Sequence, residues 1–465
     1  MELGLDSNFV ASNNISCYKF EIPLVYQKAE SGTKEVAVIR APRTGNIDHQ
    51  PLLYLHGGPG VATIENAQKY LSARDFKRLR EHHDIIMMDY SGTGYSGPYL
   101  CEDIWESIAA LDLTNSDEST RLSQTIKYYQ DCRDSLSVKG IDAEAFSSFQ
   151  IAADAESVRT QLGISDWNIY SVSYGTMVAL LYMRHFPSSL KSVVLDSPFP
   201  PNAKSFNFVK TLDETMNHLQ AIIDQNPVTA RQFPSIIDDF ASIAARLNVH
   251  PLNIDGTPFT GNDFAETMLY TFYKSKVVPL IPLALHEFAK GNDDLLVEWV
   301  NSLHSDDEYG TLNEFHTQMI YCYECKPRRY EDTPAALSNA YPHLSSISGI
   351  DYIQICNAFR PESPDSDHYN PIKTDIPVLV LVGEFDPGTP KSYGEATIKE
   401  MSNATLIVVP NASHAAMHFN ECTSNIVYTF LEGPNTPTNL NCIEEIQHII
   451  FPTKNLADEM SKLKK

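Results

Sequence analysis

The segment WNIYSVSYGTMVALLYMRHF, residues 167–186, carries the pattern that decides the fold. It begins with a short apolar run of strand length and ends in apolar residues at helical spacing. The turn between them, Ser171-Val172-Ser173-Tyr174-Gly175, is typical of a nucleophile elbow, which lifts a serine hydroxyl above the edge of a sheet. The usual elbow starts with glycine, and Ser171 is small enough to replace it. The alternative is a polar turn in which Ser173 only caps the following helix.

Similar apolar runs, bounded by glycine and proline, occur on both sides of this segment. We expect strands at 35–41, 51–56, 84–88, 167–172, 192–195, 378–382 and 405–409, and helices at 151–162, 175–186 and 421–431. Amphipathic helical stretches such as 208–223 and 235–247 dominate the region between them. Apolar strands separated by helices predict an α/β fold with a mostly parallel sheet covered on both faces. The core is expected at residues 1–200 and 371–465, interrupted by a largely helical cap at 201–370.

A serine nucleophile needs a base, and the base needs an acid that orients it. Asp386 directly follows the strand expected at 378–382, and His414 directly follows the one at 405–409. Both therefore lie at carboxyl ends of strands, where the sites of open α/β sheets assemble. Glu384 and His418 are close rivals in the sequence. Position past the strand ends favours Asp386 as the acid and His414 as the base.

The turn His56-Gly57-Gly58-Pro59-Gly60 follows another expected strand. Glycines allow the backbone to approach a substrate closely and to point N–H groups at it. A tetrahedral intermediate requires two such donors. We expect one to be the N–H of Tyr174 and the other to be the N–H of Gly58 or Gly57. His56 precedes the turn and is expected to be structural.

The balance of charge excludes several classes of protein. The chain has 465 residues, with 35 Lys and Arg against 59 Asp and Glu, and a net charge of −24. Nucleic acids and anionic membranes attract clustered basic residues, so neither is an expected partner. No apolar run has the length of a membrane span. The expected partner is a peptide or a small-molecule substrate, and no cofactor is expected.

The cysteine count bears on the compartment. The chain has eight cysteines, at positions 17, 101, 132, 322, 325, 356, 422 and 442. An even number allows disulfides and favours an exported protein, although no signal peptide is visible and a leader would have to be absent from this sequence. Unpaired thiols in a cytosolic enzyme are the alternative. Cys322 and Cys325 form a C-x-x-C without further ligands at zinc-site spacing, so no metal is expected.

These elements together resemble the proline iminopeptidase and tripeptidyl aminopeptidase family of α/β-hydrolases, and the tripeptidyl aminopeptidase branch in particular. The resemblance rests on residues 56–60, Ser173-Tyr174-Gly175-Thr176, Val194-Leu195-Asp196 and Gly383-Glu384-Phe385-Asp386-Pro387-Gly388-Thr389-Pro390, and on Cys17 before Glu21-Ile22-Pro23-Leu24. It covers about 1–200 and 371–445. It implies Ser173 as nucleophile, Asp386 as acid and His414 as base. The implied chemistry is the release of residues from a free peptide N-terminus through an acyl-enzyme.

The resemblance also suggests roles outside the triad. Glu324 lies in Cys322-Tyr323-Glu324-Cys325, where the family often shows Cys-x-Glu, and it is the candidate to bind the substrate amine. A disulfide beside Glu324 would fix its position. Relatives suggest the pairs Cys422–Cys442 and Cys101–Cys132, and Cys322 and Cys356 are further candidates for disulfides.

The chain departs from the family at three points. Ser91 replaces the Arg of Asp-x-Arg-Gly, Ser413 replaces the Gly before the histidine, and Ser171 begins the elbow. An esterase or amidase acting on small molecules is the alternative function. A hydrolase-like binding protein without activity is a third possibility. The presence of a candidate serine, acid and histidine argues against it.

Overall fold

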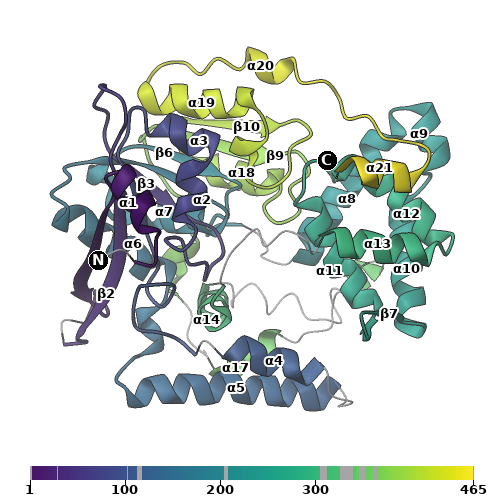
Figure 1. Cartoon of the computed structure of the whole chain (residues 1–465), viewed down its shortest axis with the longest axis horizontal. Coiled ribbons are helices and arrows are strands. Elements are labelled where there is room, and N and C mark those ends of the chain that lie inside the picture. The colour runs from purple at the N-terminus through teal and green to yellow at the C-terminus, as the bar shows by residue number, and fades with distance from the viewer. Residues whose placement is uncertain are drawn as a thin grey trace.

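A central sheet flanked by helices, a group of helices beside it and a smaller helical layer make up the molecule (Figure 1). The computed structural model describes residues 3–28, 30–101, 103–112, 118–203, 208–303, 312–324, 339–342, 344, 352–359 and 364–463. Cys325, one half of the C-x-x-C, lies outside them.

The described sheet has eight strands in the order β1-β2-β4-β3-β5-β6-β9-β10. Strand β2 runs antiparallel to both of its neighbours, and every pairing from β4 to β10 is parallel. The strands are β1 (Ser16–Pro23), β2 (Thr33–Ala41), β3 (Leu52–Leu55), β4 (Ile85–Met88), β5 (Trp167–Val172), β6 (Leu190–Asp196), β9 (Val378–Gly383) and β10 (Ala404–Val409). The predicted α/β fold class is confirmed, and each expected strand is present. Strand β1 was not predicted.

The parallel strands end in register along one edge of the sheet. Leu55 at the end of β3 is opposite Ser171 of β5, and Val172 is opposite Asp196 at the end of β6. Gly383 at the end of β9 is opposite Val409 at the end of β10. The loops that follow these strands therefore emerge close together. These loops contain every residue that the sequence analysis assigned to the triad.

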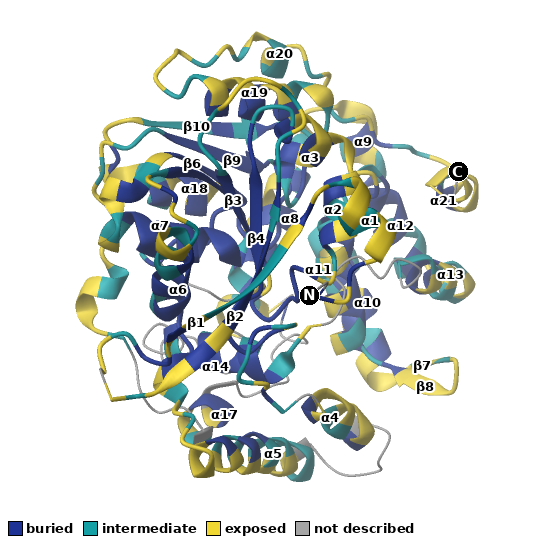
Figure 2. Ribbon diagram, turned by 60° about the vertical axis from the view of Figure 1, so that its left-hand side comes forward, coloured by how far each residue is buried: buried dark blue, intermediate teal, exposed yellow. Residues whose placement is uncertain are grey.

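Alternate residues of the strands face opposite layers of helices, as a sheet buried on both sides requires. Val36 and Val38 belong to a cluster with α6 (Ser148–Gln161), α7 (Tyr174–His185) and α18 (Lys391–Thr397). Ala37 and Ile39 belong to a cluster with the helices of the other face, which are α1 (Ser7–Ser12), α2 (Ala67–Ser72), α3 (Arg74–Leu79) and α19 (Glu421–Glu432). In Figure 2 the central strands are dark blue between these layers, whereas the edge strand β1 is largely intermediate or exposed.

A largely helical region is inserted between β6 and β9. Its first part has its own apolar core, in which Phe240, Phe264 and Trp299 are buried. The elements of this part are α8 (Phe208–Asp224), α9 (Pro227–Gln232), α10 (Ile236–Val249), α11 (Gly261–Phe272), α12 (Ile281–Ala289) and α13 (Asp293–Leu303), with the small hairpin β7 (Leu252–Ile254) and β8 (Thr257–Phe259). We call these elements the cap bundle.

The rest of the inserted region packs elsewhere. Helices α14 (Glu314–Glu324) and α17 (Tyr352–Phe359) join α4 (Ile104–Asp112) and α5 (Glu118–Val138), which interrupt the core between β4 and α6. Their shared apolar cluster includes Tyr129, Phe315 and Ile355. This layer lies below the sheet in Figure 1. Helices α4 and α5 lie within the segment 1–200 that was expected to be core, and this layer was not predicted.

Three disulfides connect described elements. Cys101–Cys132 joins the loop before α4 to α5, and Cys322–Cys356 joins α14 to α17. Cys422–Cys442 joins α19 to α20 (Asn441–Glu444). The first and third confirm the pairings suggested by the resemblance. The second pairs two cysteines for which only participation in a disulfide was expected.

The C-terminal segment returns from the core to the cap bundle. After α20 it crosses the molecule and ends in α21 (Leu456–Leu463), which contacts α12 and α13 (Figure 1). Phe451, Leu456 and Met460 are buried in the apolar core of the cap bundle. Residues after about 450, which were expected with the hydrolase core, therefore pack with the inserted region, because the amphipathic α21 buries its apolar face there.

None of the helices in the described residues combines the length and the apolar character that a membrane crossing needs. Within the same residues, no group of three or more His, Cys, Asp or Glu side chains is placed to hold a metal ion.

Candidate active site

Ser173 occupies a strained turn between β5 and α7. Its φ and ψ angles are 55° and −127°, values that side chains other than glycine rarely adopt. Its N–H donates to the Asp196 carbonyl at 2.9 Å. Although Ser173 stands at the N-cap of α7, its side chain makes no capping hydrogen bond. The hydroxyl is therefore not used for capping, and backbone strain of this kind, worth about 1–3 kcal/mol, is a feature of functional sites.

Small residues on both sides of Ser173 allow this turn to form. A Cβ atom on Gly175 would lie 2.3 Å from the Leu55 carbonyl oxygen, so only glycine lets α7 approach β3 this closely. Ser171, which replaces the first glycine of the usual elbow, is fully buried, and its hydroxyl donates to the Val194 carbonyl at 3.1 Å. The departure at Ser171 thus leaves the geometry of the turn intact.

Asp386 and His414 meet at the same edge of the sheet. His414 Nδ1 lies 2.8 Å from Asp386 Oδ2, and 11% of the His414 side chain is exposed. The two loops are joined by their backbones, because the Phe385 N–H donates to the Ala412 carbonyl at 2.9 Å. A carboxylate at this distance fixes the imidazole with its proton on Nδ1 and leaves Nε2 as the acceptor.

The Asp386 carboxylate is held ionised by its surroundings. Burial alone would raise its pKa, but the charge and hydrogen bond of His414 and two donors from Thr389 outweigh burial, and the pKa lies below its usual range. Oδ1 accepts the N–H groups of Gly388 at 3.0 Å and Thr389 at 2.9 Å. Oδ2 accepts the Thr389 hydroxyl at 2.7 Å in addition to His414. This role of Thr389 was not predicted, although Thr389 lies in the motif of residues 383–390.

Glu384 and His418, the alternative candidates for the acid and the base, contact other residues. Glu384 Oε2 accepts the Asn411 N–H at 2.8 Å, and Glu384 Oε1 lies 3.2 Å from His218 Nε2 on α8. His418 Nδ1 lies 2.7 Å from Asp75 Oδ2 on α3. The two candidate acids were Asp386 and Glu384, and the two candidate bases were His414 and His418. Of these four residues, Asp386 and His414 contact each other.

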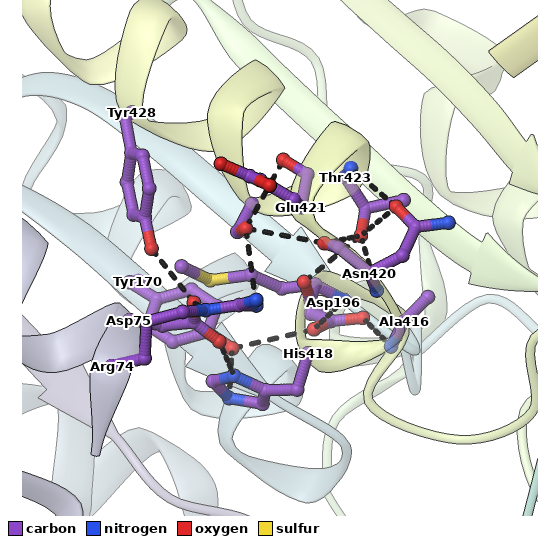
Figure 3. A network of polar contacts seen from close by, with 12 residues as sticks. Arg74, Asp75, Tyr170, Asp196, Ala416, His418, Asn420, Glu421, Thr423 and Tyr428 are labelled. Atoms are coloured by element: carbon purple, nitrogen blue, oxygen red, sulfur yellow. Dashed lines mark hydrogen bonds and ion pairs between the residues drawn. The ribbon is translucent and has the colours of Figure 1, made fainter. Parts of the chain in front are cut away.

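His418 belongs to a network that anchors the loop after His414 (Figure 3). Asp196 accepts the N–H groups of Ala416 at 2.8 Å and Met417 at 3.0 Å. Tyr170 lies between Asp196 and His418, with its hydroxyl 3.3 Å from each. Ser197 adds one more contact, since its hydroxyl accepts the Ala415 N–H at 2.9 Å. The end of β6 therefore fixes the loop on the C-terminal side of His414.

The glycine turn after β3 lies against the nucleophile. A Cβ atom on Gly57 would be 2.9 Å from Ser173 Cβ, and Gly58 has a positive φ of 121°. Tyr174 is the first residue of α7, where backbone N–H groups have no partner within the helix. The N–H groups of Tyr174 and of the turn at 57–58 thus belong to segments that adjoin the Ser173 side chain.

Helix α14 of the inserted region contacts the glycine turn at residues 57–60. The sequence did not predict this contact. The Thr317 hydroxyl donates to the Pro59 carbonyl at 2.6 Å, and the Asn313 N–H donates to the Gly60 carbonyl at 2.9 Å. The Tyr321 hydroxyl lies 3.5 Å from the Gly58 carbonyl oxygen. These partners are more than 250 residues apart in the sequence, and no local pattern could have paired them.

Glu324 ends α14 and is 2% exposed. Its Oε1 accepts the Ser148 N–H at 2.5 Å, and its Oε2 accepts the Ser148 hydroxyl at 2.7 Å. The Ser148 hydroxyl in turn lies 2.7 Å from the Tyr174 hydroxyl. Glu324 is therefore connected to the residue after the nucleophile through Ser148. Each carboxylate oxygen can accept a second hydrogen bond, so the bonds from Ser148 leave Glu324 able to bind a substrate ammonium.

The sequence pattern of the family described as "alpha/beta hydrolase fold" matches residues 50–421. The chain belongs to the α/β-hydrolase family.

Its relatives include several named peptidases. It is 22% identical to the "Serine protease Hip1" of Mycobacterium tuberculosis, over 90% of this chain and 86% of that protein. It is 24% identical to the "Proline iminopeptidase" of Neisseria gonorrhoeae, over 39% of this chain and 43% of that one. For the "Tripeptidyl aminopeptidase" of Streptomyces coelicolor the identity is also 24%, over 43% of this chain and 38% of that one. A solved proline iminopeptidase from Mycobacterium smegmatis superposes with a TM-score of 0.42 at 17% identity, over 90% of this chain and 98% of that one.

Proposed function

We propose that the protein is a serine exopeptidase that releases N-terminal residues, either proline or short peptides, through an acyl-enzyme. The observation that carries the proposal is that the strained turn of Ser173 and the Asp386–His414 contact both follow strand ends at one edge of the sheet. The three relatives described above are named as a serine protease or as aminopeptidases, which supports peptide substrates.

In this proposal Ser173 Oγ attacks the scissile carbonyl carbon and gives its proton to His414 Nε2. The oxygen that becomes negative is stabilised by the N–H of Tyr174 and by the N–H of Gly58 or Gly57. His414 then protonates the leaving amine, and the C–N bond breaks to leave an ester on Ser173. Water hydrolyses this ester by the same steps, with His414 again as the base. Asp386 stays ionised and stabilises the imidazolium in both stages.

An exopeptidase must also recognise the free ammonium group of its substrate. Glu324 is the carboxylate that the resemblance assigns to this task, and it remains our candidate. Its contacts with Ser148 suggest a second role, in which Glu324 orients the Tyr174 side chain. The two roles differ in their kinetics. Loss of an ammonium ligand raises KM for substrates with a free amine only, whereas loss of an orienting group affects all substrates alike.

The alternative function is an esterase or amidase that uses the same three residues on small molecules. The two functions differ in whether the enzyme needs a free N-terminus. The deciding experiment measures kcat/KM on fluorogenic amides of one, two and three residues, each with a free and with an acetylated N-terminus. The exopeptidase proposal expects a strong preference for the free amines, and equal rates on both forms would contradict it.

Two variants complete this experiment. Ser173→Ala is expected to abolish hydrolysis of every substrate, and full activity in this variant would contradict the mechanism. Glu324→Gln tests the ammonium site on the same pairs of substrates. A rise in KM confined to the free amines supports the assignment, and equal losses on free and acetylated forms contradict it.

We also propose that the protein acts outside the cytosol. Three disulfides among the described residues support this, because such bonds persist in oxidising compartments.

A further inference from the structure

Ser413, the residue before His414, ties the catalytic loop to the cap bundle. It is fully buried, and its hydroxyl donates to the Phe272 carbonyl at the end of α11. Its N–H donates to the Ser275 hydroxyl at 2.8 Å. A glycine at position 413 could form only the second of these bonds. The serine that departs from the family's glycine thus adds a bond to the inserted region.

Tyr273 contacts His414 itself. The two rings meet edge to face, with centroids 4.8 Å apart and planes inclined at 73°. The Tyr273 hydroxyl reaches the loop that carries Asp386, since a Cβ atom on Gly388 would lie 2.1 Å from it. The same side chain therefore contacts the loop of the acid and the ring of the base. We call residues 272–275 the α11 turn.

The core holds the C-terminal side of His414, whereas the core and the cap bundle together hold its N-terminal side. On the C-terminal side, Ser197 and Asp196 of the core bind the N–H groups of Ala415 and Ala416. On the N-terminal side, Ser413 binds the α11 turn of the cap bundle, and the acid loop of the core adds Phe385, whose carbonyl lies 3.3 Å from the Ser413 hydroxyl and whose N–H binds Ala412. A general base works only within narrow limits of position, and a misplacement of 1 Å can cost about 100-fold in rate.

We propose that the α11 turn is a positioning element for His414, and that Ser275 and Tyr273 of this turn and Ser413 of the catalytic loop are the positioning residues. Docking of the cap bundle and alignment of the base are then one event. The inference rests on the proposed function only in taking His414 as the base. It does not depend on whether the substrate is a peptide or an ester.

The test compares Ser413→Ala, Ser275→Ala and Tyr273→Leu with the wild type. Ser242→Ala, an exposed serine on α10, serves as a matched control. We expect kcat to fall about 10- to 100-fold in the first three, with KM changed less than about twofold. The acid limb of the kcat/KM profile should move to lower pH, because a displaced imidazole loses part of its stabilisation by Asp386. Tyr273→Phe, which keeps the ring, should recover most of the rate lost in Tyr273→Leu.

The rate of covalent labelling by a fluorophosphonate gives a second readout that needs no substrate. It should fall with kcat in the three variants while the melting temperature of Ser275→Ala stays within a few degrees of the wild type. Ser275→Ala decides the matter if the buried Ser413→Ala unfolds. Wild-type labelling in a folded Ser275→Ala, or a matching loss in Ser242→Ala, would overturn the inference. Failure of the proposed function would instead show as labelling that survives Ser173→Ala.

Discussion

Replacing Asp386 by asparagine separates the charge of the acid from its shape. In the folded protein Oδ1 accepts two backbone N–H groups, from Gly388 and Thr389, while Oδ2 faces His414. The asparagine amide must place its oxygen where the two backbone donors point, because its NH2 group cannot accept them. Its NH2 group then faces His414 Nδ1, which can no longer donate there.

The expected loss of kcat follows from the tautomer that Asp386→Asn imposes on His414. His414 must present a lone pair at Nδ1 and carry its proton on Nε2, so that Nε2 cannot take the proton of Ser173. In a Ser-His-Asp triad the same exchange lowers kcat by about 10⁴. At about 1.36 kcal/mol per tenfold change, this is a barrier higher by about 5.4 kcal/mol. The fold should survive, since the side chains have the same shape and the two backbone bonds remain.

The assay is steady-state hydrolysis of the best fluorogenic substrate, with circular dichroism and thermal unfolding as controls. Glu384→Gln is the matched variant, because it makes the same chemical change two residues away. We expect Asp386→Asn to lose about 10⁴ in kcat and Glu384→Gln to stay within about threefold of the wild type. A folded Asp386→Asn with more than about a tenth of wild-type kcat, or a larger loss in Glu384→Gln, would refute the reasoning.

Three further predictions address the turn, a disulfide and pH. Gly57→Ala should lower kcat by about 10²–10³ without unfolding the protein. The reason is that the new methyl group would lie 2.9 Å from Ser173 Cβ and displace an oxyanion donor. Steady-state kinetics and thermal unfolding check both parts of this prediction. Replacing both Cys422 and Cys442 by serine should lower the free energy of unfolding by about 3 kcal/mol in urea titrations, given a loop of 20 residues, and should leave kcat near the wild-type value. Burial lowers the pKa of His56 to about 4, so the unfolded state binds more protons between this value and the ordinary 6.5. Stability should therefore fall by about 3 kcal/mol as the pH is lowered from 7 to 4, and urea titrations of His56→Gln should show that this part of the pH dependence is missing.

The strands of the sheet were predictable because parallel strands buried on both faces are continuous apolar runs. Strands β5 and β9 are buried at every position, and their sequences show it. Strand β1 escaped prediction because it pairs at the edge, where only Ile22 is buried. Helix α5 escaped for a related reason: it is a polar surface helix with little amphipathic pattern.

In the candidate site, too, some residues could be predicted from local sequence and others could not. Ser173, Asp386 and His414 follow the ends of β5, β9 and β10 within five residues, and the positions of strand ends can be read from local sequence. The α11 turn and α14 meet the site through contacts between residues more than 130 apart, such as Ser275 with Ser413 and Thr317 with Pro59. No periodicity encodes such pairs. They depend on how the inserted region folds back onto the core.

The central claim is that Ser173 is a nucleophile activated by His414. The most direct test incubates the wild type, Ser173→Ala and His414→Gln with a fluorophosphonate and locates the adduct by mass spectrometry of peptides. We predict a single adduct on Ser173 in the wild type, no adduct in Ser173→Ala, and labelling slower by at least about 10³ in His414→Gln. An adduct on another residue, or labelling of His414→Gln at the wild-type rate, would contradict the claim.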